Sequence, residues 1–172
     1  MSKAFEQVVD EIRGQRILVA NRGITARRIL KSIQEVFQAI PVLTVTDADK
    51  TAPFTAGAQE LILLGKNPRG YLDIDRIVSL ARKRNIAALH PGWGFASEDF
   101  TFPQKCKDKD IPFIGPSSEA MQLLGNKVQV RELARRLDIP VVPGSQGAVS
   151  IEEARQIAEE IGSLQPGKYA DI

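Results

Sequence analysis

A histidine followed by a glycine-rich turn is the part of the sequence whose residue types best suit a ligand site. His90, the only histidine of the chain, ends an apolar run, and Gly92 and Gly94 flank Trp93, the only tryptophan. A glycine lacks the Cβ atom that would keep backbone amides away from a ligand. The local pattern alone still favours a tight turn with a packed Trp93, because glycine and proline mark turns more often than sites. A lone histidine at a strand end is also more often a hydrogen-bonded structural residue than an acid or base, so no catalytic residue is assigned.

Two other groups of polar residues could do chemistry, but structural explanations are favoured for both. Asp47 and Asp49 lie two residues apart after an apolar run, which would suit a metal ion, yet aspartates are common in polar turns. Cys106, the only cysteine, lies among lysines that could lower its pKa, but no base accompanies it. A single cysteine also excludes an internal disulfide. We therefore assign neither a metal site nor a nucleophile.

The composition is that of a globular protein without a strongly charged partner. The 172 residues suffice for one domain, or for one domain and part of another. The formal net charge of +2 implies no strong field for nucleic acid. No apolar run is long enough to cross a membrane, and residues 1–16 lack a signal-peptide core. We expect a cytoplasmic protein that binds neither nucleic acid nor a membrane; a mitochondrial location would require a transit peptide that had been removed.

The elements that must position the turn alternate along the first 114 residues. Short apolar runs predict strands at 17–20, 41–46, 60–64, 86–89 and 111–114. Apolar residues at helical spacing predict helices at 4–12, 25–38, 74–84, 119–124, 127–137 and 151–161, and a further helix after Ser97 with a late start or bend near Pro103. Asp73 can cap the helix at 74–84, and residues 126–129 and 150–153 have the pattern of capping boxes. This alternation predicts an α/β fold with a doubly wound, Rossmann-like parallel sheet, whose strand ends carry the turn. The first strand-to-helix turn, Asn21-Arg22-Gly23, lacks the G-x-G-x-x-G fingerprint, so we predict no dinucleotide site there.

Seven stretches occur in the order and at the spacing of one family. They are ILVANRG (17–23), DAD (47–49), YL (71–72), HPGWGF (90–95), FIGP (113–116), GNK (125–127) and PVVPG (140–144). On these stretches the chain resembles the N-terminal part of biotin carboxylase, as found in acetyl-CoA, propionyl-CoA and pyruvate carboxylases. The resemblance implies a Rossmann-like pre-ATP-grasp domain at 1–114, connecting helices at 115–145, and a truncated or divergent start of an ATP-grasp lid at 146–172.

The resemblance also implies a reaction, that of an ATP-grasp ligase. Such an enzyme uses MgATP to activate bicarbonate as carboxyphosphate and then carboxylates biotin on a carrier protein. ATP, Mg²⁺ and biotin would be cofactors of the full-length enzyme, with none held firmly by this part. The implied partners are the biotin carboxyl carrier domain and the carboxyltransferase of the same enzyme. A second copy of the chain, in a homodimer, is a further possible partner.

The resemblance transfers site roles to a few residues only. Lys127 matches the family lysine that contacts ATP phosphate, and a lysine is a compact positive charge suited to phosphate. The alternative is an ordinary lysine in a first helical turn, where the helix dipole disfavours a cation. Four residues of the turn, His90, Gly92, Trp93 and Gly94, would line the edge of the active-site cleft.

The chain also departs from the family pattern. Ile24 and Trp93 stand where the family usually has glutamate and tyrosine, and Asp99 stands where it usually has asparagine. After Gly162 the sequence matches neither the lid strand nor the glycine-rich phosphate loop, so Lys168 is not assigned the role of the lid lysine. We therefore expect this chain by itself not to turn over.

Two rival hypotheses remain from the sequence. One is a stand-alone, non-catalytic domain of carboxylase ancestry that binds a partner subunit or a nucleotide. The other is an unrelated Rossmann-like nucleotide enzyme, against which the missing glycine fingerprint argues.

Overall fold

The computed structural model describes residues 3–141 and 149–161, and it confirms the predicted α/β class. The chain divides into two compact units, with the boundary between Met121 and Gln122. The predicted extended segment 139–144 lies mostly outside the described residues, as do Gly162 and Lys168. Within the described ranges, no helix has the length and apolar character needed to cross a membrane.

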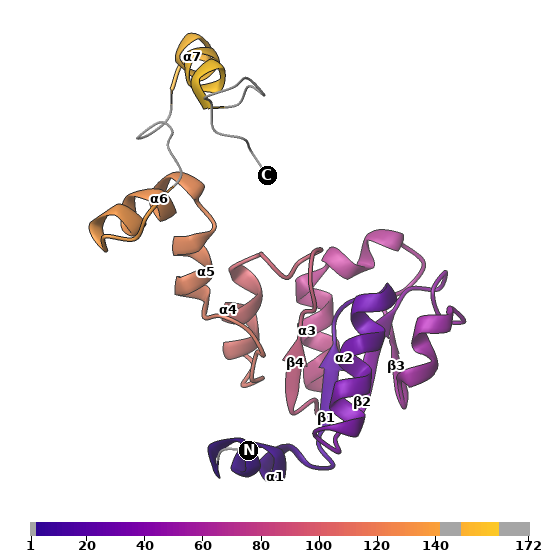
Figure 1. The fold of residues 1–172 in the computed structure, drawn as a ribbon. Helices are drawn as coiled ribbons and strands as arrows, with labels where there is room; N and C mark the ends of the chain where they lie inside the picture. The colour runs from indigo at the N-terminus through magenta and orange to yellow at the C-terminus, as the bar shows by residue number, and fades with distance from the viewer. Residues whose placement is uncertain (1–2, 142–148, 162–172) are drawn as a thin grey trace. The chain divides into compact units, whose positions relative to one another are not determined.

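Four parallel strands form the sheet of the first unit (Figure 1). They are β1 (Arg16–Val19), β2 (Ile40–Val45), β3 (Glu60–Leu63) and β4 (Ala88–His90), in the order β3-β2-β1-β4. In this register Leu18 of β1 pairs with Val42 of β2 and with Leu89 of β4. β1 is therefore an inner strand, and the chain leaves it toward β2 on one side while β4 lies on the other.

The predicted fifth strand at 111–114 is reduced to a single bridge between Leu89 and Phe113. The Leu89 N–H donates to the Pro112 carbonyl at 2.9 Å, and the Ile114 N–H donates to the Leu89 carbonyl at 2.8 Å. Pro112 has no N–H to extend the ladder, which is the physical reason why the run does not become a regular strand.

Helices follow the strands as the sequence predicts, with boundaries shifted by a few residues. The helices up to residue 124 are α1 (Lys3–Ile12), α2 (Gly23–Glu35), α3 (Ile74–Lys83), α4 (Thr101–Lys107) and α5 (Ser118–Leu124), with 3-10 helices η1 (Pro53–Gly57) and η2 (Pro68–Leu72). Asp73 caps α3 by accepting a hydrogen bond from the Arg76 N–H at 3.0 Å. α4 begins only at Thr101, with Pro103 in its first turn, where the missing N–H costs nothing.

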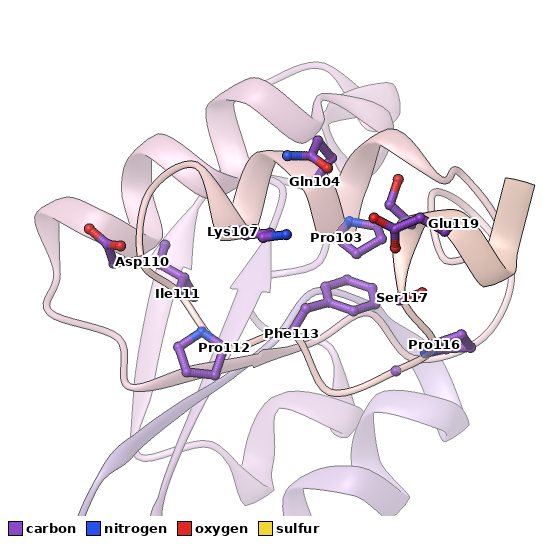
Figure 2. Close-up of a pocket in the computed structure, with 12 residues that line it drawn as sticks. Pro103, Gln104, Lys107, Asp110, Ile111, Pro112, Phe113, Pro116, Ser117 and Glu119 are labelled. Carbon is purple, nitrogen blue, oxygen red and sulfur yellow. The ribbon is translucent and has the colours of Figure 1, made fainter.

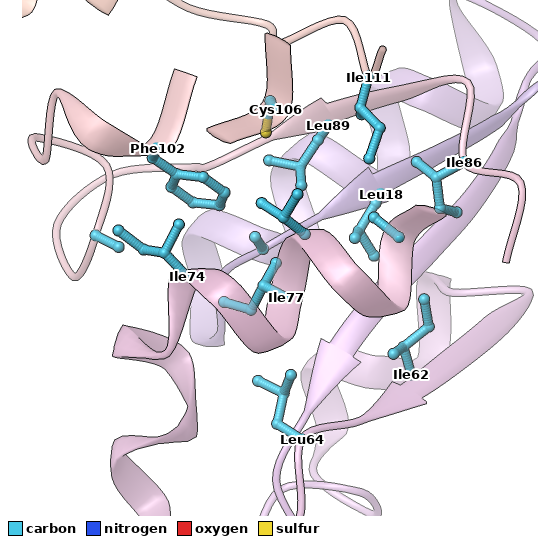
Figure 3. Packing of buried hydrophobic residues seen from close by; sticks show 14 of the residues in the cluster. Leu18, Ile62, Leu64, Ile74, Ile77, Ile86, Leu89, Phe102, Cys106 and Ile111 are labelled. Carbon is cyan, nitrogen blue, oxygen red and sulfur yellow. The ribbon is translucent and has the colours of Figure 1, made fainter. Parts of the chain in front are cut away.

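Both faces of the sheet carry a core, because alternate residues of a strand point to opposite faces. On one face α3 and α4 pack with Leu18, Ile62 and Leu89; Figure 3 shows Ile77 and Phe102 in this cluster. On the other face α2 packs through buried apolar residues against the alternate positions of the same strands.

The second unit contains two further helices with well-formed N-termini. They are α6 (Lys127–Arg136) and α7 (Ile151–Ile161). Asn126 Oδ1 caps α6, accepting from the backbone N–H groups of Val128 and Gln129 at 3.0 and 3.3 Å. At α7 the predicted capping box is confirmed: the Ser150 N–H donates to Glu153 Oε2 at 2.9 Å, and the Glu153 N–H donates to Ser150 Oγ at 3.2 Å.

Candidate functional site

The carboxyl ends of β1, β2 and β4 bring three of the seven family stretches to one edge of the sheet. β1 continues into Asn21 and Arg22, β2 into the 46–49 turn, and β4 into the 90–95 turn. The chain leaves β1 toward β2 and leaves β4 in the opposite direction along the sheet. The edge between β1 and β4 is therefore a topological switch point, where open α/β sheets bind ligands.

Asn21 joins the loop after β1 to the turn after β4. Its Nδ2 donates to the carbonyl oxygens of Pro91 and Trp93 at 2.8 and 3.0 Å, and its Oδ1 accepts from the Arg22 N–H at 2.9 Å. Asn21 is only 1% exposed. A Cβ at Gly92 would lie 2.4 Å from Asn21 Nδ2, and the backbone of Gly92 has a φ of +74°. Glycine is therefore required at this position by both space and conformation.

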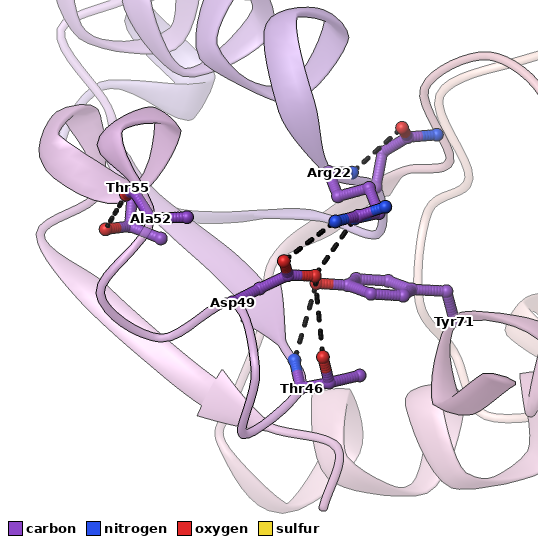
Figure 4. A network of polar contacts seen from close by, with 7 residues as sticks. Arg22, Thr46, Asp49, Ala52, Thr55 and Tyr71 are labelled. Carbon is purple, nitrogen blue, oxygen red and sulfur yellow. Dashed lines mark hydrogen bonds and ion pairs between the residues drawn. The ribbon is translucent and has the colours of Figure 1, made fainter. Parts of the chain in front are cut away.

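Arg22, Asp49 and Tyr71 form a polar network beside Asn21 (Figure 4). The guanidinium of Arg22 binds Asp49 through both carboxylate oxygens, at 2.9 and 2.8 Å. Tyr71 donates its hydroxyl hydrogen to Asp49 Oδ2 at 2.8 Å, and Thr46 Oγ1 lies 3.4 Å from the same oxygen. The ring of Tyr71 also lies 5.5 Å from the ring of Phe95, centroid to centroid. The network thus connects the loops after β1 and β2 with η2 and the far end of the 90–95 turn.

The network fixes the ionisation states of its members. Burial would raise the pKa of Asp49, but the hydrogen bonds from Arg22 and Tyr71 outweigh it and lower the pKa below the ordinary value. Burial and the hydrogen bond to Asp49 raise the pKa of Tyr71 to about 12. At neutral pH Asp49 is therefore an anion, paired with Arg22 and accepting from a neutral tyrosine.

His90 has a hydrogen-bonded place in the turn. Its Nδ1 accepts from the Gly92 N–H at 2.9 Å, and burial lowers the pKa of His90, which favours the neutral imidazole that can accept. Trp93, in contrast, is 76% exposed. Gly94 has a φ of +69°, and a Cβ there would meet no atom within 4 Å. Glycine at 94 therefore serves the backbone conformation alone.

Two cavities lie in the first unit, and His90 lines one of them. That cavity, of about 820 Å³, is mainly apolar and runs between α2 and the β4 side of the sheet, with Ile24, Arg28 and Ile114 also in its lining. The other, of about 560 Å³, is built by α4 and residues 110–119, with Phe113 and Lys107 among its lining residues (Figure 2). Gly92, Trp93 and Gly94 are absent from the linings of both.

The remaining sequence candidates fall elsewhere. Lys127 is the first residue of α6 in the second unit, so it belongs to a different unit from the 90–95 turn. Cys106 is fully buried, and burial raises its pKa to about 12, so the neighbouring lysines do not activate the thiol. Among residues 3–141 and 149–161, no three His, Cys, Asp or Glu side chains gather to hold a metal ion.

The sequence analysis missed the ion pair of Arg22 and Asp49 and its link to Tyr71. The signal was present, because these residues belong to three separate family stretches, at 17–23, 47–49 and 71–72. Periodicity could not reveal that the three meet, since only the strand order places their loops side by side.

Residues 13–121 match the family described as biotin carboxylase, N-terminal domain. The small subunit of 2-oxoglutarate carboxylase from Hydrogenobacter thermophilus is 38% identical over 151 residues, which cover 86% of this chain and 32% of the relative. A biotin carboxylase from Nostoc is 39% identical over 150 residues, 86% of this chain and 33% of the relative.

Solved structures agree with the sequence relatives. The biotin carboxylase domain dimer of the Hydrogenobacter thermophilus enzyme, in complex with MgADP, ADP and bicarbonate, gives a TM-score of 0.77 at 38% identity, covering 87% of this chain and 33% of that one. A biotin carboxylase from Campylobacter jejuni in a β,γ-ATP complex gives 0.77 at 36% identity, covering 88% and 34%. The chain thus spans about a third of the length of these four relatives.

Proposed function

Because the chain belongs to the family of the biotin carboxylase N-terminal domain, we propose that it supplies this domain to an enzyme that carboxylates biotin with bicarbonate and ATP. The observation that supports the proposal is the turn after β4, held at the switch point of the sheet by Asn21. The related Hydrogenobacter domain binds MgADP and bicarbonate. Since the chain spans about a third of that relative, the other two thirds of such an enzyme would supply the remaining groups.

The 90–95 turn would form one border of the active-site cleft in the whole enzyme. Its glycines keep the backbone free of Cβ atoms, and its exposed Trp93 would face the cleft. The Arg22–Asp49–Tyr71 network would keep this border rigid, with its charge neutralised internally. None of these residues takes part in proton transfer in this proposal.

Lys127 would contact a phosphate of ATP. It follows the helix cap Asn126 directly, so its place on the backbone is well defined. Mg²⁺ would screen the phosphates, and its protein ligands would come from other segments of the enzyme, since the described residues offer no cluster for it. For the same reason we expect this chain alone to hold no cofactor firmly and to release no ADP.

The partners follow from the same proposal. Carboxylated biotin must be carried to a second reaction, which calls for a biotin carboxyl carrier domain and a carboxyltransferase. The related Hydrogenobacter domain is a dimer, and a homodimer is the corresponding proposal for the enzyme that contains this chain.

A chimeric enzyme tests the function. The chain would replace the homologous third of the Nostoc biotin carboxylase, and ADP release that depends on both biotin and bicarbonate would be measured. We expect activity in the chimera and none in the isolated chain. Lys127→Gln should raise the KM for ATP roughly tenfold or more, the equivalent of one charge-assisted contact. Lys83→Gln, on an exposed position of α3, is the matched control.

Two results would contradict the proposal. Biotin-dependent ADP release by the isolated chain would contradict the dependence on the rest of the enzyme, and an active chimera whose KM for ATP does not respond to Lys127→Gln would contradict the role of Lys127. An immunoblot of the source cells separates the stand-alone alternative, which requires a native band at 18.9 kDa rather than a heavier one.

A further inference from the structure

The carboxamide of Asn21 makes three hydrogen bonds, all to backbone groups, and uses both of its donor hydrogens. Both Nδ2 hydrogens go to the turn, one to the Pro91 carbonyl and one to the Trp93 carbonyl, and Oδ1 accepts from the Arg22 N–H. The group is 1% exposed, so water does not compete for these bonds. A buried amide in this state is expensive to disturb, because each lost partner leaves a desolvated polar atom.

The turn needs such a restraint because part of its backbone is strained. Gly92, Gly94 and Phe95 all have positive φ values, which glycine adopts without strain but Phe95, at +53°, does not. For a residue with a bulky side chain this region costs about 1 to 2 kcal/mol. Strain of this kind persists only where the surroundings determine the conformation. The two carbonyls that Asn21 binds lie on either side of Gly92, at the start of the strained segment.

The other end of the turn, at Phe95, is held through Arg22, the residue that follows Asn21. Phe95 packs on the ring of Tyr71, whose hydroxyl is fixed by Asp49, and Asp49 is bound by Arg22. Asn21 and Arg22, adjacent in sequence, therefore hold opposite ends of the turn. Trp93 carries one of the two carbonyls that Asn21 binds, and Phe95 follows two residues later.

We infer that Asn21 is a positioning residue: its two donated hydrogen bonds fix the 90–95 turn and so determine where the Trp93 side chain stands at the carboxyl edge of the sheet. Its bearing on catalysis rests on the proposed function, in which this turn borders the cleft. The experiment concerns the turn alone and uses no ATP or biotin, so it succeeds or fails independently of the chimera.

NMR relaxation of the 172-residue chain tests the inference. Backbone order parameters of Trp93 and Gly94 should be near 0.85 in the native protein, as in rigid backbone, and should fall below about 0.6 in Asn21→Ala and in Asn21→Asp. In its ionised form the aspartate variant keeps the shape and the acceptor of Asn21 but replaces the two donors by an anionic oxygen that faces both carbonyls. Asn126→Ala removes a capping carboxamide from the second unit and is the matched control, expected to leave both values unchanged.

The outcomes are distinct. Native order parameters in folded Asn21→Asp would mean that side-chain shape, and not the two donated bonds, holds the turn, which would overturn the inference. If both Asn21 variants fail to fold, hydrogen exchange in the unaltered protein decides. The side-chain amide hydrogens of Asn21 should then exchange at least tenfold more slowly than those of exposed Asn126, whose Nδ2 donates no bond described here; equal rates would refute the inference.

Discussion

Replacing either of two glycines in the same turn by alanine should have unequal consequences. Gly92 and Gly94 have similar backbone angles, with φ of +74° and +69°. The left-handed conformation therefore destabilises an alanine by about the same free energy at either position, about 1 kcal/mol. The gain from a less flexible unfolded chain is also the same for both. These two contributions cancel when the variants are compared.

What remains is the contact with Asn21. A Cβ at Gly92 would lie 2.4, 2.6 and 2.7 Å from Nδ2, Cγ and Cβ of Asn21, whereas a Cβ at Gly94 would meet nothing within 4 Å. Forcing extra atoms into a packed region costs typically about 1 to 3 kcal/mol. We therefore expect Gly94→Ala to lose about 1 kcal/mol of unfolding free energy and Gly92→Ala to lose about 2 to 4 kcal/mol.

Urea unfolding measures the difference. Far-UV circular dichroism follows the unfolding, because Trp93 lies between the two substituted residues and is already exposed in the folded chain, so its fluorescence would report unfolding poorly. Equal losses in the two variants, within about 0.5 kcal/mol, would refute the argument from the contact. The excess cost of Gly92→Ala should also vanish in an Asn21→Gly background, because all three crowded atoms are then absent. A persisting excess in the double variant would mean that the crowding comes from elsewhere.

Three further predictions concern the buried groups. Asp49→Asn should lower the unfolding free energy at pH 7 by about 2 kcal/mol, because it removes the anion that Arg22 binds. The control Asp75→Asn breaks an exposed ion pair with Lys105 and should lower it by less than about 1 kcal/mol. The midpoints of urea unfolding compare the two variants. Folding lowers the pKa of Asp49, so the stability that its carboxylate contributes is present above the ordinary value of 3.8 and is lost as the pH falls through the folded value. The unfolding free energies of the native protein and of Asp49→Asn should therefore converge below about pH 3.8. A constant difference down to pH 2 would contradict this. Cys106 should be alkylated by iodoacetamide at pH 8 only after unfolding. Burial raises the pKa of its thiol to about 12, so the thiolate fraction is roughly a thousandfold below that of an ordinary cysteine. Rapid labelling of the folded chain would refute the burial of Cys106.

The fold was largely readable from the sequence because buried parallel strands are short apolar runs and the helices between them carry caps. Four strands were predicted within one or two residues, and Asp73 was identified as a helix cap. The run at 111–114 has the same apolar character, yet it forms one bridge only. Hydrophobicity predicts burial, whereas a strand also needs a continuous ladder of donors, and Pro112 interrupts it.

The candidate site was less readable. Gly92 and Gly94 look equivalent in the sequence, but one is pressed against Asn21 and the other faces open space. Asp49 looked like a turn residue or a metal ligand, and it is the partner of Arg22. Such pairings depend on which strands are neighbours, and that information lies in the topology of the sheet and in no local pattern.

The hydrogen bond between Asn21 and Pro91 spans 70 positions of the chain, and this separation sets an order of events in time. At ordinary rates of synthesis, about 5 to 20 residues per second, Asn21 waits roughly 4 to 14 seconds for its partner. During that interval β1 lacks β4, so the side of β1 that β4 later covers is an unpaired edge of apolar residues, open to any other strand. A nascent chain that has not yet made β4 therefore exposes an edge prone to aggregation, and the turn at the carboxyl edge cannot take its hydrogen bonds from Asn21 before β4 has been made.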